Sequence, residues 1–575
     1  MDTTRTLLVT GATGGIGQAT VLALLAEGHR VVATGRDATS LLALQGKARD
    51  AGHTLVVIEL DVTSASSLAE ARADVLARVG VPDVIVHAAG IAELGPLMIT
   101  TEPALERHFA TNVLGAMAVT RAFLEPMRTR GSGRIVHVGA VVDRLTLATH
   151  GAYGASMYAL RALNDTLRQE LRPFGIDVVL VEPGTVRTGF LDAAFDGLDA
   201  KRTEGSRWNE VIDRLQTLKR AVSWIGVAPE RVASVLVKAS TVPSPRRRYG
   251  VTAAGATVQL GAKHLLPTRA FDGIVRATLG LAKRVGVAKS LGTPIALVTG
   301  AGGRLGGPSA LALAKAGFRV FATDSDPATL THLEGHENVE TLTLDVTDPR
   351  SVGSALRDVD ARTGGYGVDL LLNSAGYVDP APMDLVDERT WQRTFAVNAV
   401  GAMRVTRLVA QRMCDRGSGR IVNVSSVAGV MAFPFVGPYQ ASKFALEALS
   451  DALRQELHPF GVDVVLIEPS FIADGFADRV AKSIESRGEA AAHWRPILPH
   501  LPAIEGRLGV LGGDAEEVAQ VVAEAATMPR PSPRFAAPWT ASVAVRAEPW
   551  LPAAVTDRVF HELFALGDVG ARPPG

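Results

Sequence analysis

The feature that most constrains this chain is that it repeats itself. From Asn112 to Pro183 the sequence recurs as Asn398 to Pro469, at a constant offset of 286 positions. Each repeating unit has the length of a whole domain, so the pattern is a tandem duplication and not a solenoid of short motifs. A chain of 575 residues is also too long for a single hydrophobic core. We therefore expect two similar domains, residues 1–288 and 289–575, hereafter copy one and copy two.

Within each copy, short apolar runs alternate with longer stretches of helical period. This alternation is typical of βαβ units, in which helices cover both faces of a parallel sheet. The β-branched runs read as strands buried in the middle of such a sheet. In copy one these runs are Leu7–Thr10, Val31–Ala33, Val84–Val86, Ile135–Val138 and Val178–Val181. The predicted fold class is α/β, with two doubly wound, parallel-sheet Rossmann-fold domains in tandem.

A glycine-rich turn follows the first strand of each copy and opens a helix. In copy one its glycines are Gly11, Gly15 and Gly17. In copy two they are Gly300, Gly303 and Gly306, and Arg304 stands where copy one has Gly15. Such a turn brings backbone amides and a helix N-terminus to the diphosphate of a dinucleotide. Arg304 either contacts a phosphate or points to solvent.

The stretch from Gly419 to Lys443 in copy two carries groups suited to carbonyl chemistry. Ser426 ends an apolar run, and Tyr439 opens a helical pattern. Lys443 follows Tyr439 by four residues, so the two side chains share a helix face, where a cation favours the phenolate. A free tyrosine titrates near pH ~10, too high for acid-base work in neutral water without such help.

The serine on a strand, the Tyr-x-x-x-Lys pattern, the glycine turn and the upstream NSAG and NAVG segments resemble the short-chain dehydrogenase/reductase family. The resemblance implies a catalytic tetrad of Asn398, Ser426, Tyr439 and Lys443. In the family the serine binds the carbonyl oxygen and the tyrosine transfers the proton. The lysine lowers the tyrosine pKa and holds the nicotinamide ribose, and the asparagine anchors a water that leads to solvent.

Copy one departs from this tetrad. It keeps Asn112 and Tyr153, but Ala140 replaces the serine and Met157 replaces the lysine. Without the hydroxyl and the cation, copy one is expected to be nearly inert in hydride transfer, since losing a general acid typically costs ~10²- to 10⁴-fold in rate. Asp143 or His150 could substitute in a different reaction; the alternative is that they are ordinary loop residues.

The end of the second strand differs between the copies in a way that bears on the cofactor. Asp324 in copy two can bond both ribose hydroxyls and repels a 2′-phosphate, which favours NAD(H). Arg36 in copy one can bind a 2′-phosphate, which favours NADP(H). By resemblance Asp61 and Asp345 contact the adenine.

Two further segments near the cofactor site differ between the copies. By resemblance Asn373 belongs to the cofactor site, and His87 replaces it in copy one as a strand-end histidine with satisfied hydrogen bonds. Copy one also keeps the family's PGxxxT motif at 183–188, whereas copy two has EPSFIAD. This loop touches the nicotinamide carboxamide in the family.

Each copy also carries an insert after its sixth strand, about 190–226 and 476–512, that resembles a substrate-covering loop. Its aromatic residues either line an apolar pocket or fill space beneath the loop. The segment 256–285 either covers the first pocket, touches a membrane surface or packs between the copies. Family members pair through two long helices, so we expect the copies to form a pseudo-dimer within one chain, with further self-association possible.

Charge and cysteine content exclude some classes of function. Lys plus Arg and Asp plus Glu both number 59, which gives no reason to expect nucleic acid as a partner. Cys414 is the only cysteine, so no intramolecular disulfide can form. With no apolar run long enough for a membrane span and no signal-peptide pattern, we expect a cytoplasmic protein. No metal-ligand pattern stands out.

Three functions are compatible with these sequence features. The leading prediction is an NAD(P)-dependent oxidoreductase that interconverts a ketone and a secondary alcohol on a fairly apolar small molecule at copy two. The first alternative is a redox-neutral isomerase, epimerase or cyclase that uses a retained nucleotide or the altered pocket of copy one. The second is a nucleotide-responsive binding protein without turnover.

Overall fold

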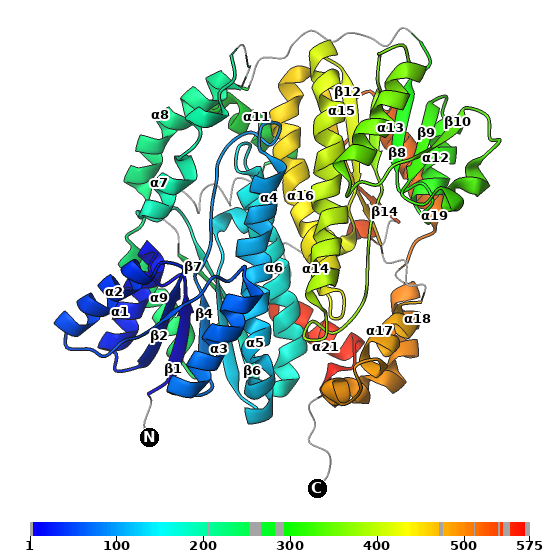
Figure 1. Cartoon of the computed structure of the whole chain (residues 1–575). Coiled ribbons are helices and arrows are strands. Elements are labelled where there is room, and N and C mark those ends of the chain that lie inside the picture. The colour runs from blue at the N-terminus through cyan, green and yellow to red at the C-terminus, as the bar shows by residue number, and fades with distance from the viewer. Residues whose placement is uncertain are drawn as a thin grey trace.

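The computed structural model of the chain describes residues 4–251 except 205 and 207, 266–281, 292–470, 475–510, 512–538, 541–543 and 553–569. It confirms the predicted fold class: two Rossmann-like α/β domains lie side by side (Figure 1). The predicted boundary near residue 288 lies outside the described residues. So do the parts of the 256–285 segment that precede residue 266 or follow residue 281.

Among the described residues, each copy has one fully parallel sheet, and the two sheets have the same strand order. The first runs β3-β2-β1-β4-β5-β6-β7, with strands β1 (Thr6–Thr10), β2 (Arg30–Gly35), β3 (Val56–Glu59), β4 (Val84–His87), β5 (Gly133–Val138), β6 (Ile176–Pro183) and β7 (Arg248–Val251). The second runs β10-β9-β8-β11-β12-β13-β14, with strands β8 (Ile295–Thr299), β9 (Arg319–Asp324), β10 (Val339–Thr343), β11 (Leu370–Asn373), β12 (Gly419–Val424), β13 (Val462–Pro469) and β14 (Arg534–Ala537).

Helices connect the strands on both faces of each sheet. Those of copy one are α1 (Gly15–Ala26), α2 (Ala38–Asp50), α3 (Ala65–Val79), α4 (Glu102–Phe109), α5 (Ala116–Arg130), α6 (Gly151–Leu171), α7 (Gly189–Phe195), α8 (Asn209–Ile225), α9 (Pro229–Thr241) and α11 (Thr268–Thr278). Those of copy two are α12 (Gly306–Lys315), α13 (Pro349–Arg362), α14 (Glu388–Phe395), α15 (Ala402–Arg416), α16 (Gly437–Leu457), α17 (Phe476–Glu485), α18 (Leu501–Val510), α19 (Ala515–Thr527) and α21 (Ala553–Leu563). Segments of 3₁₀ helix span Pro327–Leu333 and Gly488–His500.

The two faces of each sheet bury different neighbours. On one face, α1 and α9 in copy one, and α12 and α19 in copy two, form separate apolar clusters. On the other face, a single cluster of buried side chains runs through both copies. It passes through α6 and α16, which pack against each other at the centre of the molecule (Figure 1). Nearly every residue of these two helices is buried, so each helix needs the other copy to cover it.

The inserts pack across this interface. Trp208 in the copy one insert packs edge-on against Phe460 of copy two, with ring centroids 5.2 Å apart. Trp494 in the copy two insert packs against Phe174 of copy one at 5.4 Å. The two tryptophans are therefore buried between the copies, as the space-filling alternative predicted. Phe476, by contrast, lines a cavity in copy two.

The last described helix of each copy contacts the long helix of the other. Asp272 of α11 is ion-paired with Arg454 of α16 at 2.7 Å. Asp557 of α21 is paired with Arg168 of α6 at 2.9 Å. All four side chains are buried or nearly so. The described part of the 256–285 segment therefore packs between the copies, which was one of its three predicted roles.

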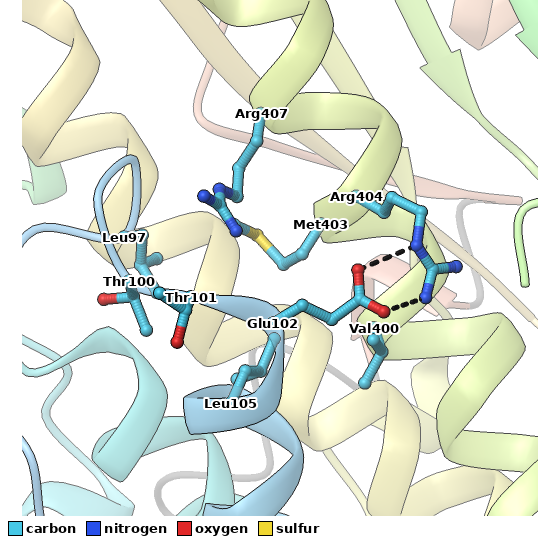
Figure 2. A pocket seen from close by; sticks show the side chains of 9 residues that line it. All are labelled: Leu97, Thr100, Thr101, Glu102, Leu105, Val400, Met403, Arg404 and Arg407. Carbon is cyan, nitrogen blue, oxygen red and sulfur yellow. Dashed lines mark hydrogen bonds and ion pairs between the residues drawn. The ribbon is translucent and has the colours of Figure 1, made fainter. Parts of the chain in front are cut away.

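A small crevice also lies between the copies, where α4 meets α15 (Figure 2). Glu102 of α4 makes a two-point ion pair with Arg404 of α15, while Met403 and Arg407 reach over the same space. The cavity is about 10 Å³, which is room for a single water molecule. The crevice is thus part of the interface between the copies and has no room for a substrate. No helix among the described residues is long and apolar enough to cross a bilayer.

The two buried ion pairs between the copies lead to a stability prediction. Among the described residues, changing Asp272 to Asn leaves the buried Arg454 with Asp451 as its only ionised partner. We therefore expect the free energy of unfolding to fall by about 3 kcal/mol. Asp557→Asn should act similarly through Arg168, which keeps Asp165. Thermal unfolding followed by circular dichroism measures both. The control is Glu562→Gln, which breaks an exposed pair with Arg558 and should leave the midpoint unchanged.

Candidate functional site

Copy two contains a cavity of about 900 Å³ at the carboxyl ends of its strands. This is the edge at which doubly wound sheets bind their ligands. The cavity joins the glycine turn to the predicted catalytic residues and to the start of α17. Its lining includes Gly300, Gly303, Arg304, Gly306, Asp324, Asp345, Ser426, Tyr439, Lys443, Phe476 and Arg479.

The predicted serine, tyrosine and lysine meet in this cavity. Ser426 follows strand β12 and is held in extended backbone by its own hydroxyl, which accepts the N–H of Ala428 at 3.1 Å. Tyr439 stands in the first turn of α16, and Lys443 lies one turn further on. The ammonium of Lys443 lies 5.6 Å from the centre of the Tyr439 ring and donates to the carbonyl of Val424 at 2.7 Å.

Burial dominates the electrostatics of this site. Burial raises the pKa of Tyr439 to about 12, against the opposing effect of a hydrogen bond with Ser426. Burial lowers the pKa of Lys443 to about 8, although Glu447 one turn away raises it. At neutral pH the tyrosine is therefore protonated and the lysine is largely charged. This is the state in which a phenol can donate a proton to a carbonyl oxygen.

Asn398, the fourth residue of the predicted tetrad, has a clear structural role. It sits in a wide turn of π-helix, Ala396–Gly401, and its side-chain oxygen accepts the N–H of Tyr377 at 2.7 Å. Its amide donates to the Tyr377 carbonyl and to Ser442. Asn112 makes the same three bonds in copy one, to Ile91 and Ser156. The asparagine thus ties the loop after the fourth strand to the long helix in both copies.

The glycine turn of copy two fits a dinucleotide. Gly300 has φ +69°, and a Cβ on it would lie 2.5 Å from the backbone of Ala375, so no other residue fits there. A Cβ on Gly306 would lie 2.1 Å from the carbonyl oxygen of Gly300. Asp324 ends β9 at the cavity, with one carboxylate oxygen accepting the N–H of Gly302 at 3.1 Å. The second oxygen remains directed to the end of the strand, where it accepts the N–H of Asp326.

Copy one has rearranged the same turn. Where copy two has Gly302 and Asp324, copy one has Thr13 and Gly35, and a Cβ on Gly35 would lie 3.2 Å from the Thr13 hydroxyl. Arg36 is exposed next to this turn. The hydrogen bonds from Thr63 lower the pKa of Asp61, and the charge of Arg36 adds a smaller effect in the same direction. Asp61 and Asp345 each accept the N–H and hydroxyl of a threonine two residues on. Asp345 also lines the cavity.

In copy one, apolar side chains stand at two of the four predicted tetrad positions. Ala140 and Met157 are buried in the common core, and Tyr153 packs against Phe190 with ring centroids 6.0 Å apart. Burial, and then the charge of Asp143, raises the pKa of Tyr153 well above its usual value. Asp143 is buried, with an ion pair to Arg144 at 3.8 Å. His150 is bonded to the carbonyl of Ala148 and is not aimed at Tyr153 by any described contact.

His87 and Asn373 occupy matching places in the two sheets, and sequence reasoning missed their partners. Asn373 donates to Asn423 on the next strand at 2.8 Å, and it is not among the residues that line the cavity. In copy one the pair is His87 and His137, with parallel rings 5.0 Å apart. Among the described residues, His87 bonds Thr120 through one nitrogen and its Nδ1 has no partner. The predicted histidine with satisfied hydrogen bonds is therefore satisfied at one nitrogen only. Burial lowers the pKa of both histidines, so both are neutral.

A buried charge cluster behind Lys443 was also missed. Arg534 of β14 contacts Glu447, Asp451 and Glu468 at 2.8–3.1 Å. Burial raises the pKa of Glu447 and Glu468. The residues come from α16, β13 and β14, and no local spacing pattern links them. No group of three His, Cys, Asp or Glu residues in the described part of the chain could hold a metal ion.

Comparisons with known proteins agree with this geometry. The family model described as short chain dehydrogenase matches residues 5–198 and again 294–484. The uncharacterized oxidoreductase YbbO of Escherichia coli K12 is 34% identical over 273 residues, 47% of this chain and 94% of its own. Human 17-beta-hydroxysteroid dehydrogenase type 1 is 33% identical over 258 residues, 43% of this chain and 77% of its own.

A solved structure extends the likeness across both copies. The N-domain of a bacterial malonyl-CoA reductase with NADP superposes with a TM-score of 0.59 at 20% identity. The match covers 81% of this chain and 91% of that one. Since neither copy alone amounts to 81% of the chain, the shared fold includes parts of both sheets.

Lys443 gives the second prediction, that Lys443→Met stabilises the nucleotide-free protein. Its pKa falls from about 10.5 in the unfolded chain to about 8 in the native state, so the native state binds fewer protons between these values. Burying the ammonium therefore costs about 3 kcal/mol below pH 8, and the cost is relieved as the pH rises toward 10.5. Losing the bond to Val424 costs about 1–2 kcal/mol.

We therefore expect Lys443→Met to raise the melting midpoint at pH 7 by about 1–2 °C. The gain should disappear by about pH 10, as followed by calorimetry across the pH range. The matched control is Met157→Lys in copy one, which buries a new ammonium beside Arg161 and should lower the midpoint. A destabilised Lys443→Met variant would contradict the assignment of burial as the dominant effect.

Proposed function

Because the chain belongs to the short-chain dehydrogenase family and is thus an NAD(P)-dependent oxidoreductase, we propose that copy two carries the hydride transfer. The reaction interconverts a ketone and a secondary alcohol on a fairly apolar small molecule. The observation that carries the proposal is that Ser426, Tyr439 and Lys443 share one large cavity with a glycine turn. The relative that acts on 17β-hydroxysteroids supports an apolar substrate class.

The residues of copy two have distinct roles in this proposal. A bound nicotinamide supplies the hydride donor or acceptor. Ser426 donates a hydrogen bond to the substrate oxygen, and the phenol of Tyr439 gives its proton to that oxygen in reduction or removes it in oxidation. The Lys443 ammonium stabilises the phenolate that reduction leaves behind. Phe476 at the start of α17 offers an apolar wall that keeps water from the reacting carbonyl.

The nucleotide preference differs between the copies in our proposal. Asp324 would bind the ribose hydroxyls of NAD(H) in copy two, since its carboxylate stands at the cavity and disfavours a 2′-phosphate. Arg36 favours NADP(H) in copy one, where Gly35 removes the competing carboxylate. Whichever nucleotide it binds, copy one serves as a packing partner of copy two and not as a second catalytic site.

The packing of α6 on α16 supports an intramolecular pseudo-dimer. Fusing the copies makes the contact intramolecular, so its effective concentration does not depend on that of the protein. Copy one keeps the long helix and the hydrogen bonds of Asn112 to it, although Ala140 and Met157 stand where copy two has the serine and the lysine. Such a pattern is what a copy retained for packing would show.

The third prediction separates catalysis from packing. Tyr439→Phe removes the proton donor and should lower kcat by about 10²- to 10⁴-fold. The matched variant Tyr153→Phe in copy one should keep kcat within about twofold. The assay follows nicotinamide absorbance with a panel of secondary alcohols that includes a 17β-hydroxysteroid. Equal losses in both variants, or full activity of Tyr439→Phe, would refute hydride transfer at copy two.

The fourth prediction concerns the nucleotide. Asp324→Ala removes hydrogen bonds to the ribose and should weaken NADH binding about tenfold, with tighter NADPH binding. Calorimetric titration of the nucleotide-free protein measures both constants and the number of sites. Arg36→Ala is the counterpart in copy one and should weaken only NADPH. An unchanged NADH affinity after Asp324→Ala would show that copy two does not select its nucleotide through this carboxylate.

A further inference from the structure

One carboxylate of copy one reaches into the loop that leads to the catalytic tyrosine of copy two. Glu170, in the last turn of α6, accepts the N–H of Phe435 through Oε1 and the N–H of Met383 through Oε2, both at 2.7 Å. Phe435 lies four residues before Tyr439. Met383 belongs to the loop that follows β11 and carries Tyr377 into the cavity. A single side chain therefore joins two loops of the other copy.

The backbone at this point needs such support. Phe435 has φ +70°, a left-handed conformation that costs a non-glycine residue free energy. Its carbonyl accepts the N–H of Ala381 at 2.7 Å, which closes the contact between the two loops. Both N–H groups held by Glu170 are buried, so they have no water to turn to if the carboxylate is lost.

Two further residues of α6 bind the same loop. Gln169 donates to the carbonyl of Ala432 at 3.1 Å, and Thr166 accepts a hydrogen bond from Gln440, the residue after Tyr439. Gln440 in turn bonds both the N–H and the carbonyl of Phe433. Residues spaced by three and four positions along α6 thus hold the loop from both ends. The loop held in this way includes Val436, which lines the same cavity as Tyr439.

The opposite contact exists as well. Glu456 of α16 accepts the N–H of Thr149 at 2.8 Å and of Leu97 at 2.7 Å, the positions in copy one that match Phe435 and Met383. Thr149 also has a positive φ, +71°. The two contacts are buried alike and cross the same interface. They differ in that Glu456 supports the loop before Tyr153, which lacks the serine and lysine partners.

We propose that Glu170 of copy one is a positioning residue for the active site of copy two: it fixes the 433–436 loop, and through it the orientation of Tyr439. This inference rests on the proposed function, because it assigns the activity to copy two. It explains why a copy without catalytic groups is needed beyond covering an apolar face. The reacting phenol is set by a carboxylate that copy two does not contain.

The test compares Glu170→Gln with Glu456→Gln in the full chain. Each change keeps size and burial but turns an amide N–H₂ toward a backbone N–H, so both variants lose a similar interaction. Amide hydrogen exchange read by mass spectrometry reports each loop without any substrate. We expect faster exchange in the 380–386 and 430–438 peptides for Glu170→Gln, and in the 94–99 and 145–151 peptides for Glu456→Gln.

Activity then separates positioning from general stability. With the alcohol of the panel that is turned over fastest, Glu170→Gln should lower kcat ~10- to 100-fold, since small displacements of a reacting group have effects of this size. The Kd of Glu170→Gln for NADH should stay within about twofold of the value for the unchanged protein. Glu456→Gln should lose a similar amount of melting temperature, but its kcat should also stay within about twofold. If Glu170→Gln does not fold, Glu170→Asp, one methylene shorter, is measured in the same way.

Three results would overturn the proposal. Equal losses of kcat in the two variants would mean that the interface acts only through overall stability. Unchanged exchange in the 430–438 peptide, or unchanged kcat in Glu170→Gln, would mean that the loop is held by other groups. Failure of the proposed function itself is recognised separately, because Tyr439→Phe would then retain turnover whatever Glu170→Gln does.

Discussion

The packing of α6 against α16 is the contact on which the rest of the molecule depends. Both helices are buried along almost their whole length, which a helix on the outside of a single Rossmann domain could not be. Each long helix carries predicted tetrad positions near its start and a glutamate that reaches the other copy near its end. The contact that buries apolar area therefore also places Glu170 of copy one at the loops of copy two. Stability and site geometry are thus joined in one pair of helices.

The side-chain contacts between the copies follow an approximate twofold symmetry. Glu170 corresponds to Glu456, and Trp494 to Trp208, and each makes the equivalent contact in the opposite copy. In a true dimer every such contact would occur twice with identical consequences. Fusion of two divergent copies removes that identity. One loop can keep its support for chemistry while the other keeps it for packing alone, and single substitutions can therefore test each role separately.

The sequence predicted the two parallel-sheet domains because the periodicity and the glycine turns are local properties. The four-residue spacing also predicted that Tyr439 and Lys443 would share a helix face, and the family resemblance placed Ser426 with them. The sequence could not predict Glu170 at Phe435, because the two residues are 265 positions apart and no local pattern marks the pairing. The interpretation of the insert tryptophans remained open for the same reason: a buried aromatic residue looks alike in a pocket and in an interface.

The differences between the copies also extend beyond the four positions of the predicted tetrad. In copy two the buried Lys443 lies one turn from Glu447, and Gly429 leaves room for that turn, since a Cβ there would lie 3.2 Å from the Glu447 side chain. Copy one has Met157, Arg161 and Asp143 at these three positions. An ammonium and a nearby carboxylate are thus replaced by a neutral side chain, a guanidinium and a new carboxylate.

Buried charges need partners, so the removal of one charge changes which neighbours are tolerated. Restoring catalysis in copy one would accordingly require more than Ala140→Ser and Met157→Lys. An added ammonium at 157 would face Arg161, and burial, with a smaller contribution from Asp143, would hold the pKa of Tyr153 high. The two copies have diverged as charge networks, and the lysine of copy two is compatible only with the network that surrounds it.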